Sequence, residues 1–166
     1  MKSMESRHLR LLLFALLITG VGFAADPYNG PRPPKPDLPY LLHADNLVAT
    51  EESEATQETK KDDITYAIRG AASPARTPLP EPIFLLESDK LLPEKLELYK
   101  LEGKNGRREL TMSAKGKRRT KAKVLRLNVT KIEGRLYRVE SAQPLEDGQY
   151  SLSPSDSNKV FGFEVY

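Results

Sequence analysis

The sequence has 166 residues, of which 26 are Lys or Arg and 23 are Asp or Glu, and its formal net charge of +3 is close to neutral. This length favours a single domain. With 30% charged and 39% hydrophobic residues, the composition is typical of a globular protein and excludes a wholly disordered chain. The absence of cysteine excludes disulfides, thiolate metal sites, iron–sulfur clusters and a cysteine nucleophile.

The first 24 residues are typical of a secretory signal peptide. Three basic residues precede the apolar run LLLFALLITGV at residues 11–21, and the small residues Gly22 and Ala24 then mark a cleavage site. A retained membrane anchor is the alternative, but the apolar stretch 11–25 is shorter than the ~20 residues that a spanning helix needs. We therefore expect an N-terminal signal helix at residues 1–24, cleavage, and export to the periplasm, the cell envelope or the extracellular space.

Prolines dominate the next segment, which reads DPYNGPRPPKPDLP at residues 26–39. Because proline fixes φ and lacks an amide donor, this segment cannot form a helix interior or a central strand. We predict a disordered, Pro-rich tether at residues 25–37. Residues 38–166 would then form one domain, which has no disulfides and depends on its hydrophobic core for stability.

The sequence of this domain favours short β-strands separated by turns. Apolar residues alternate with polar ones at residues 95–100, 109–113, 125–130, 136–139, 150–152 and 161–165. Asn105-Gly106 supplies a tight hairpin turn between the first two of these segments. Residues 38–49 and 64–68 are predicted to be two further strands. About eight short strands in this arrangement predict a mostly β protein, an antiparallel β-sandwich.

One short pattern supports a particular type of sandwich. The segment PLEDGQYSL, residues 144–152, contains L-x-x-G-x-Y-x-L, formed by Leu145, Gly148, Tyr150 and Leu152. It resembles the late hairpin of many bacterial immunoglobulin-like and transthyretin-like modules. The resemblance implies an immunoglobulin-like or transthyretin-like architecture and no particular activity.

Charge is distributed unevenly along the chain. Residues 104–126 hold ten basic side chains and one acid, a local charge of +9, whereas the rest of the predicted mature chain carries −8. The densest part, residues 114–123, lacks apolar anchors and is predicted to be an exposed basic loop. Such a loop can bind anionic polymers, for example glycans or lipid head groups, with salt-sensitive affinity. The candidate polyanion-binding residues are Arg107, Arg108, Lys115, Lys117, Arg118, Arg119, Lys121 and Lys123.

Other interpretations of the charged segments stay open. A run of like charges is usually solvated surface that discourages edge-to-edge pairing of strands. Residues 51–63, EESEATQETKKDD, are predicted to form a mobile acidic loop, which could complement the basic loop within one molecule or between neighbours. Because the basic loop lacks aromatic residues for base stacking, specific nucleic-acid recognition is not expected.

The sequence offers little material for catalysis. His43 is the only histidine after the predicted leader, which excludes a histidine metal cluster, and with Asp45 it would form only part of a catalytic site. Residues 155–158, SDSN, lack the series of acids of a calcium loop and are typical of a turn. We expect no enzyme activity, no metal and no cofactor.

These patterns predict an exported, non-enzymatic β-sandwich module that binds an anionic polymer or a protein partner, with no membrane span after signal cleavage. One alternative is a structural or assembly subunit that associates by edge-strand pairing or by complementary acidic and basic loops. Another is a small hydrolase with His43 as its base.

Overall fold

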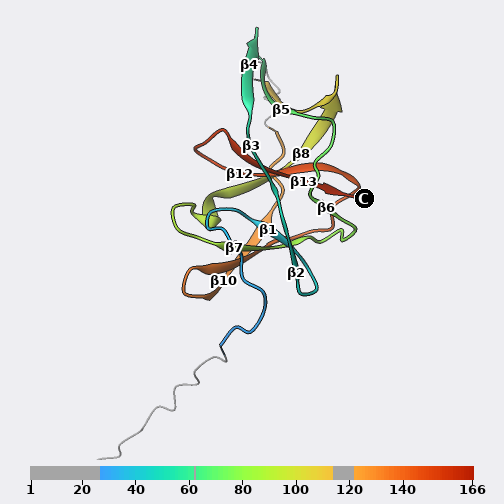
Figure 1. Cartoon of the computed structure of the whole chain (residues 1–166). Coiled ribbons are helices and arrows are strands. Elements are labelled where there is room, and N and C mark those ends of the chain that lie inside the picture. The colour runs from blue at the N-terminus through green and yellow to red at the C-terminus, as the bar shows by residue number, and fades with distance from the viewer. Residues whose placement is uncertain (1–26, 62, 114–121) are drawn as a thin grey trace, which may run out of the picture.

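The computed structural model describes residues 27–61, 63–113 and 122–166 (Figure 1). Within these ranges the chain forms thirteen strands and one short 3₁₀ helix, η1. The elements are β1 (Tyr40–His43), β2 (Asn46–Ala49), β3 (Glu51–Glu54), β4 (Thr56–Lys60), β5 (Asp63–Arg69), β6 (Arg76–Thr77), β7 (Ile83–Glu87), η1 (Pro93–Lys95), β8 (Leu96–Lys104), β9 (Arg107–Ser113), β10 (Leu127–Glu133), β11 (Leu136–Ser141), β12 (Gly148–Pro154) and β13 (Lys159–Val165). The predicted signal helix at residues 1–24 lies outside the described residues, and no helix within them is long and apolar enough to cross a membrane.

The strands form two sheets. One sheet has five strands in the order β10-β11-β7-β1-β2, and the other has eight, in the order β3-β13-β12-β8-β9-β5-β4 with β6 beside β13. Except for the parallel pairing of β6 with β13, the strand pairs are antiparallel. The predicted mostly β fold with antiparallel, sandwich-like sheets is therefore confirmed.

The principal core lies between the two sheets. Phe163 of β13 is fully buried and packs edge-on against Phe84 of β7, with ring centroids 5.0 Å apart. The ring of Phe163 also stacks on the ring of Tyr150 of β12, with the two centroids 5.5 Å apart. Because side chains alternate along a strand, Ser151, next to Tyr150, and Val160, next to the core residue Phe161, point to the opposite face of the large sheet.

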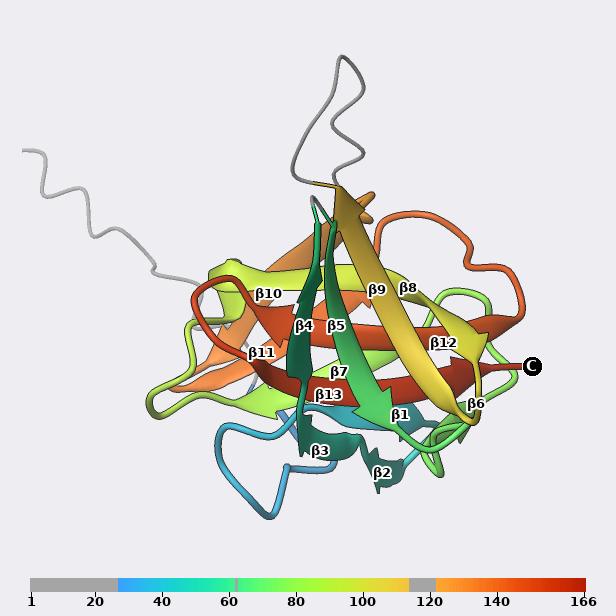
Figure 2. The same ribbon diagram turned by 90° about the horizontal axis from the view of Figure 1, so that it is seen from above.

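The large sheet folds back over that opposite face. β8 and β9 pair only next to their turn, where Glu102–Lys104 lie opposite Arg107–Glu109. Beyond these residues the two strands separate, and β9, β5 and β4 cross over β12 and β13 (Figure 2). We call β4, β5 and β9 the arm. β3 pairs with β13 and the consecutive strand β4 pairs with β5, so the chain around Ala55 joins the two ends of this sheet. Beneath the arm lies a second, smaller core, formed by Ala55, Ile68, Leu101 and Val160 with Tyr66 and Leu110 against it.

Most of the acidic segment at residues 51–63 belongs to this sheet, so the prediction of a loop there is wrong. Residues 51–54 form β3, residues 56–60 form β4, and Asp63 begins β5. Glu52, for example, accepts hydrogen bonds from Lys35 at 2.7 Å and from Lys159 at 2.8 Å. Basic residues that are distant in the sequence thus balance the negative charges of this segment, which would otherwise repel one another in a strand.

Residues 38–49, predicted as one strand, form the hairpin β1–β2. The turn contains Ala44 in the left-handed region, at a φ of 52°. His43 ends β1 and Asp45 lies in the turn, so the two residues do not lie on one strand.

The described part of the predicted tether lies against the domain. Pro33 is buried, and the carboxylate of Asp37 accepts hydrogen bonds from the backbone N–H groups of Asp89, Lys90 and Leu91 at 2.8–3.1 Å. Burial raises the pKa of Asp37, but these hydrogen bonds outweigh it and hold the pKa below its ordinary value. The folded domain therefore begins before Leu38.

Candidate functional site

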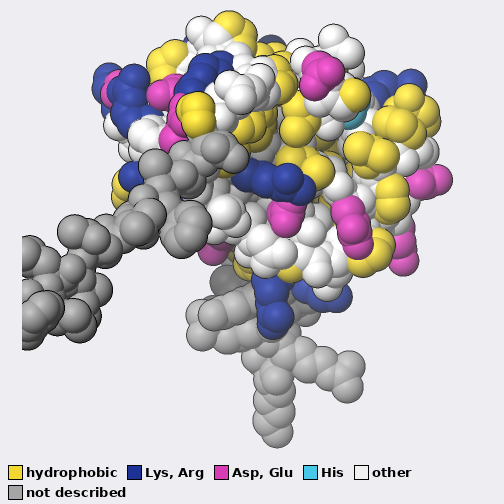
Figure 3. Space-filling model, turned by 90° about the horizontal axis from the view of Figure 1, so that it is seen from below, with side chains coloured by type: hydrophobic (Ala, Val, Ile, Leu, Met, Phe, Trp, Pro, Cys, Tyr) yellow, Lys and Arg dark blue, Asp and Glu magenta, His cyan; other side chains and the backbone are white. Residues whose placement is uncertain are grey.

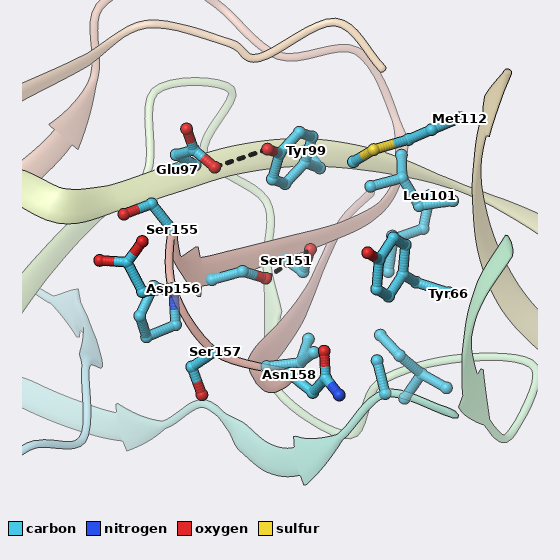
Figure 4. Close-up of a pocket in the computed structure, with 16 residues that line it drawn as sticks. Tyr66, Glu97, Tyr99, Leu101, Met112, Ser151, Ser155, Asp156, Ser157 and Asn158 are labelled. Atoms are coloured by element: carbon cyan, nitrogen blue, oxygen red, sulfur yellow. Dashed lines mark hydrogen bonds between the residues drawn. The ribbon is translucent and has the colours of Figure 1, made fainter. Parts of the chain in front are cut away.

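A cavity of about 410 Å³ opens between the arm and the strands that the arm covers (Figure 4). Its walls come from β5, β8, β9, β12, β13 and the turn between β12 and β13. The apolar lining residues are Ala55, Ile68, Leu101, Leu110, Met112, Pro154 and Val160, and the aromatic ones are Tyr66 and Tyr99. The polar lining residues are Glu97, Ser151, Ser153, Ser155, Asp156, Ser157 and Asn158.

Strand alternation explains how one strand serves two interiors. In β8, Leu96 and Leu98 point into the principal core, whereas Glu97, Tyr99 and Leu101 point under the arm. The same rule places Ser151 and Ser153 of β12 at the cavity. A strand covered on both faces can thus carry a polar residue at every second position without exposing it fully to water.

A hydrogen-bonded pair marks one wall of the cavity. The hydroxyl of Tyr99 donates to Oε2 of Glu97 at 2.6 Å (Figure 4). Burial, followed by this hydrogen bond to an acid, raises the pKa of Tyr99. The phenol therefore stays protonated near neutral pH and holds the Glu97 carboxylate in one orientation.

A buried ion pair closes another part of the space beneath the arm. Arg108 of β9 is fully buried, and its guanidinium donates to both carboxylate oxygens of Glu51 at 2.6 and 2.8 Å. It also donates to the carbonyl oxygens of Arg69 at 2.8 Å and Gly70 at 3.0 Å. Gly162 of β13 leaves room for the pair, since a Cβ there would lie 3.0 Å from both Arg108 Nη1 and Glu51 Oε2.

The structure divides the predicted polyanion-binding residues. Arg108 belongs to the interior, and its assignment to an exposed binding surface is wrong because its guanidinium is enclosed and fully paired. Arg107 is partly exposed, but it is bound to Glu109 and, at 2.6 and 3.1 Å, to Glu58. The remaining candidates within the basic segment, Lys115, Lys117, Arg118, Arg119 and Lys121, lie outside the described residues.

Lys123 is exposed and lines a second cavity of about 270 Å³. Lys100 faces the same cavity and binds Glu146 at 2.7 Å. The hydrogen bond from Lys100 lowers the pKa of that carboxyl. Elsewhere, the face formed by the five-stranded sheet mixes basic, acidic and hydrophobic side chains, so its described residues form no continuous basic patch (Figure 3).

The other residues considered for catalysis or metal binding are separate from one another. Nε2 of His43 is buried and has no hydrogen-bond partner among the described residues. Residues 155–158 form part of the turn between β12 and β13 and line the first cavity. Within the described ranges, no three His, Asp or Glu side chains lie close enough to hold a metal ion.

The first cavity was not predicted from the sequence, because its lining residues come from segments between Ala55 and Val160. One signal pointed to it. The polar positions of β12 are Gln149, Ser151 and Ser153, none of them charged, which suits a half-buried face better than open solvent.

Comparison with known proteins identifies no relative. No protein-family model matches the chain, and no curated protein or solved structure is significantly similar to it.

Proposed function

We propose that the protein is a non-enzymatic binding module that holds an amphipathic ligand in the cavity beneath the arm. One observation carries this proposal: an aliphatic floor, two tyrosines, and a rim of hydroxyl, amide and carboxylate groups meet in a single cavity (Figure 4). Small-ligand sites combine these features, with volumes of roughly 300–1,000 Å³. The cavity of about 410 Å³ lies within that range.

The same groups suit binding better than catalysis. Ser151 and Ser153 can donate or accept hydrogen bonds, but the described lining of the cavity includes no histidine or lysine to activate either hydroxyl as a nucleophile. The raised pKa of Tyr99 makes its phenol a hydrogen-bond donor and a poor base near neutral pH. We therefore expect a ligand of this cavity to be bound and released without chemical change.

Filling the cavity is expected to abolish binding. Ser153 lines the cavity from β12 and pairs with Glu97 of β8, so Ser153→Phe places a ring in the space that a ligand would occupy. Phenethyl alcohol is a suitable neutral probe, and its binding can be followed by changes in the amide NMR signals of β8 and β12. We expect saturable changes in the unchanged protein and at least a tenfold loss of affinity in the variant.

Thr130→Phe is the matched control, because Thr130 is exposed on β10 and lies outside the cavity lining. This variant should bind the probe as the unchanged protein does. Undiminished binding by Ser153→Phe, in a protein with the same melting temperature, would place the probe elsewhere.

Binding of an anionic polymer is a second candidate function. The observation that favours it is Lys123, which is exposed beside Lys100 at the second cavity and is the last residue of the predicted basic loop at residues 114–123. Salt-sensitive contacts of several such charges with one polymer would add up. The binding residues proposed are Arg107, Lys115, Lys117, Arg118, Arg119, Lys121 and Lys123.

Removing four of these charges tests the second candidate. With Lys117, Arg118, Arg119 and Lys121 all changed to Ser, we expect elution from heparin at a clearly lower salt concentration. The control changes four exposed basic residues elsewhere to Ser: Lys90, Lys131, Arg135 and Arg138. An equal decrease in the control would mean that net charge alone governs retention, which contradicts a local site.

Export and the type of sandwich complete the proposal. Export to the periplasm, envelope or extracellular space is supported by the leader at residues 1–24, and the immunoglobulin-like or transthyretin-like type by the pattern at residues 144–152. Assembly through complementary acidic and basic segments is less favoured. Glu51 and Glu58, two of the acids it needs, already pair with arginines of the same chain.

A further inference from the structure

We propose that the ligand of the cavity beneath the arm carries a cationic head, such as an ammonium group, which binds to Glu97. The ligand class is thus a small amine with an apolar, preferably aromatic, body. This inference rests on the proposed function, since it specifies the ligand of the same cavity.

The charge of the described cavity wall disfavours an anionic head. Among the described residues that line the cavity there is no Lys, Arg or His, and the two acids are Glu97 and Asp156. Asp156 is mostly exposed and is paired with Lys95 at 3.0 Å, so its charge is largely balanced. Glu97 forms no ion pair with any described residue, and its negative charge is left for the ligand to balance. A carboxylate or phosphate beside it would add an unpaired like charge at a partly buried site.

The hydrogen bonds of Glu97 leave room for a donor. An ionised carboxylate offers about four lone-pair sites on its two oxygens. Tyr99 occupies one of them, on Oε2, and fixes the carboxylate in place. Oε1 accepts no hydrogen bond from the side chains of the described residues, and an ammonium group carries three donors that suit it.

The apolar lining continues from this point along one face of β8. Glu97, Tyr99 and Leu101 follow one another at every second residue, about 7 Å apart along a strand. A head at Glu97 therefore places its body along Tyr99 towards Leu101, near which Met112 and Tyr66 also lie (Figure 4). Aromatic faces near the head add cation–π attraction, which an alcohol or a carboxylate lacks.

Three probes with nearly the same aromatic body separate the possible heads: phenethylammonium, phenethyl alcohol and phenylacetate. Their affinities are measured by NMR titration of the protein at neutral pH and low salt. We expect phenethylammonium to bind most tightly and phenylacetate at least tenfold more weakly. Glu97→Gln, which keeps an acceptor but removes the charge, should reduce the affinity for phenethylammonium to about that for phenethyl alcohol.

Glu94→Gln is the charge-matched control, because Glu94 is exposed in η1 and does not line the cavity. It should leave all three affinities unchanged. The ranking of probes on the unchanged protein does not depend on whether Glu97→Gln folds. If phenethyl alcohol or phenylacetate binds as tightly as phenethylammonium, the proposal of a cationic head is wrong, whereas the proposal that the cavity binds a ligand is still supported. If none of the three binds, the proposed function itself fails.

Discussion

The Arg108→Ala protein is expected to have a free energy of unfolding about 3–5 kcal/mol below that of the unchanged chain. The substitution leaves the Glu51 carboxylate without its cation, and the carbonyl groups of Arg69 and Gly70 lose their donors. It also leaves a cavity where the largest fully buried side chain stood. Because the side chain of Glu51 keeps 23% exposure and can recruit water, we expect the lower end of this range.

Urea unfolding followed by circular dichroism measures this effect. Arg138→Ala is the control, since Arg138 is exposed on β11 and pairs with Glu140 at the surface. It should cost no more than about 1 kcal/mol. A second variant, Arg108→Met with Glu51→Leu, removes both charges and fills the space with apolar groups. It should recover most of the loss, because replacing a whole buried ion pair is often neutral. Equal losses for the two single variants would contradict the interior role of Arg108.

The ion pair also shows which parts of the fold are difficult to predict. Arg108 and Glu51 are 57 residues apart, and each lies in a segment whose local composition is strongly charged. Composition alone predicts a solvated loop around Glu51 and an exposed, polyanion-binding side chain for Arg108. The pairing of these two residues across the sheet contradicts both predictions. One local signal was available, since a glycine such as Gly162 within an apolar strand often marks a close approach by other groups.

The second half of the domain follows its pattern more directly. In β12 and in residues 161–165 of β13 the apolar residues occupy every second position, so the residues that face the five-stranded sheet can be identified from spacing alone. Spacing does not say what covers the other face. Ser151, Ser153 and Val160 lie under the arm because β8 and β9 separate after three residue pairs, a feature without a sequence motif. The cavity therefore becomes visible only in three dimensions.

Phe163→Ala is the second substitution with a large expected effect, a loss of about 3–5 kcal/mol in the free energy of unfolding. Phe163 is fully buried and contacts Phe84 of the five-stranded sheet and Tyr150 of the large sheet. Truncation removes apolar contacts on both sides and leaves a void that two sheets, held by their backbone hydrogen bonds, cannot close. Aromatic pairs of this geometry add roughly 0.5–1.5 kcal/mol beyond the area they bury.

Tyr166→Ala is the control for Phe163→Ala. Tyr166 lies just beyond the same strand, is 54% exposed and contacts Arg76 through its ring at 4.2 Å. Its loss should cost about 1 kcal/mol or less. Hydrogen exchange adds a sharper test, because a core shared by both sheets makes them unfold together. Amides of β7 and β12 should then lose protection to the same extent in Phe163→Ala. Loss of protection in β12 alone would mean that the two sheets are stabilised independently and that Phe163 does not couple them.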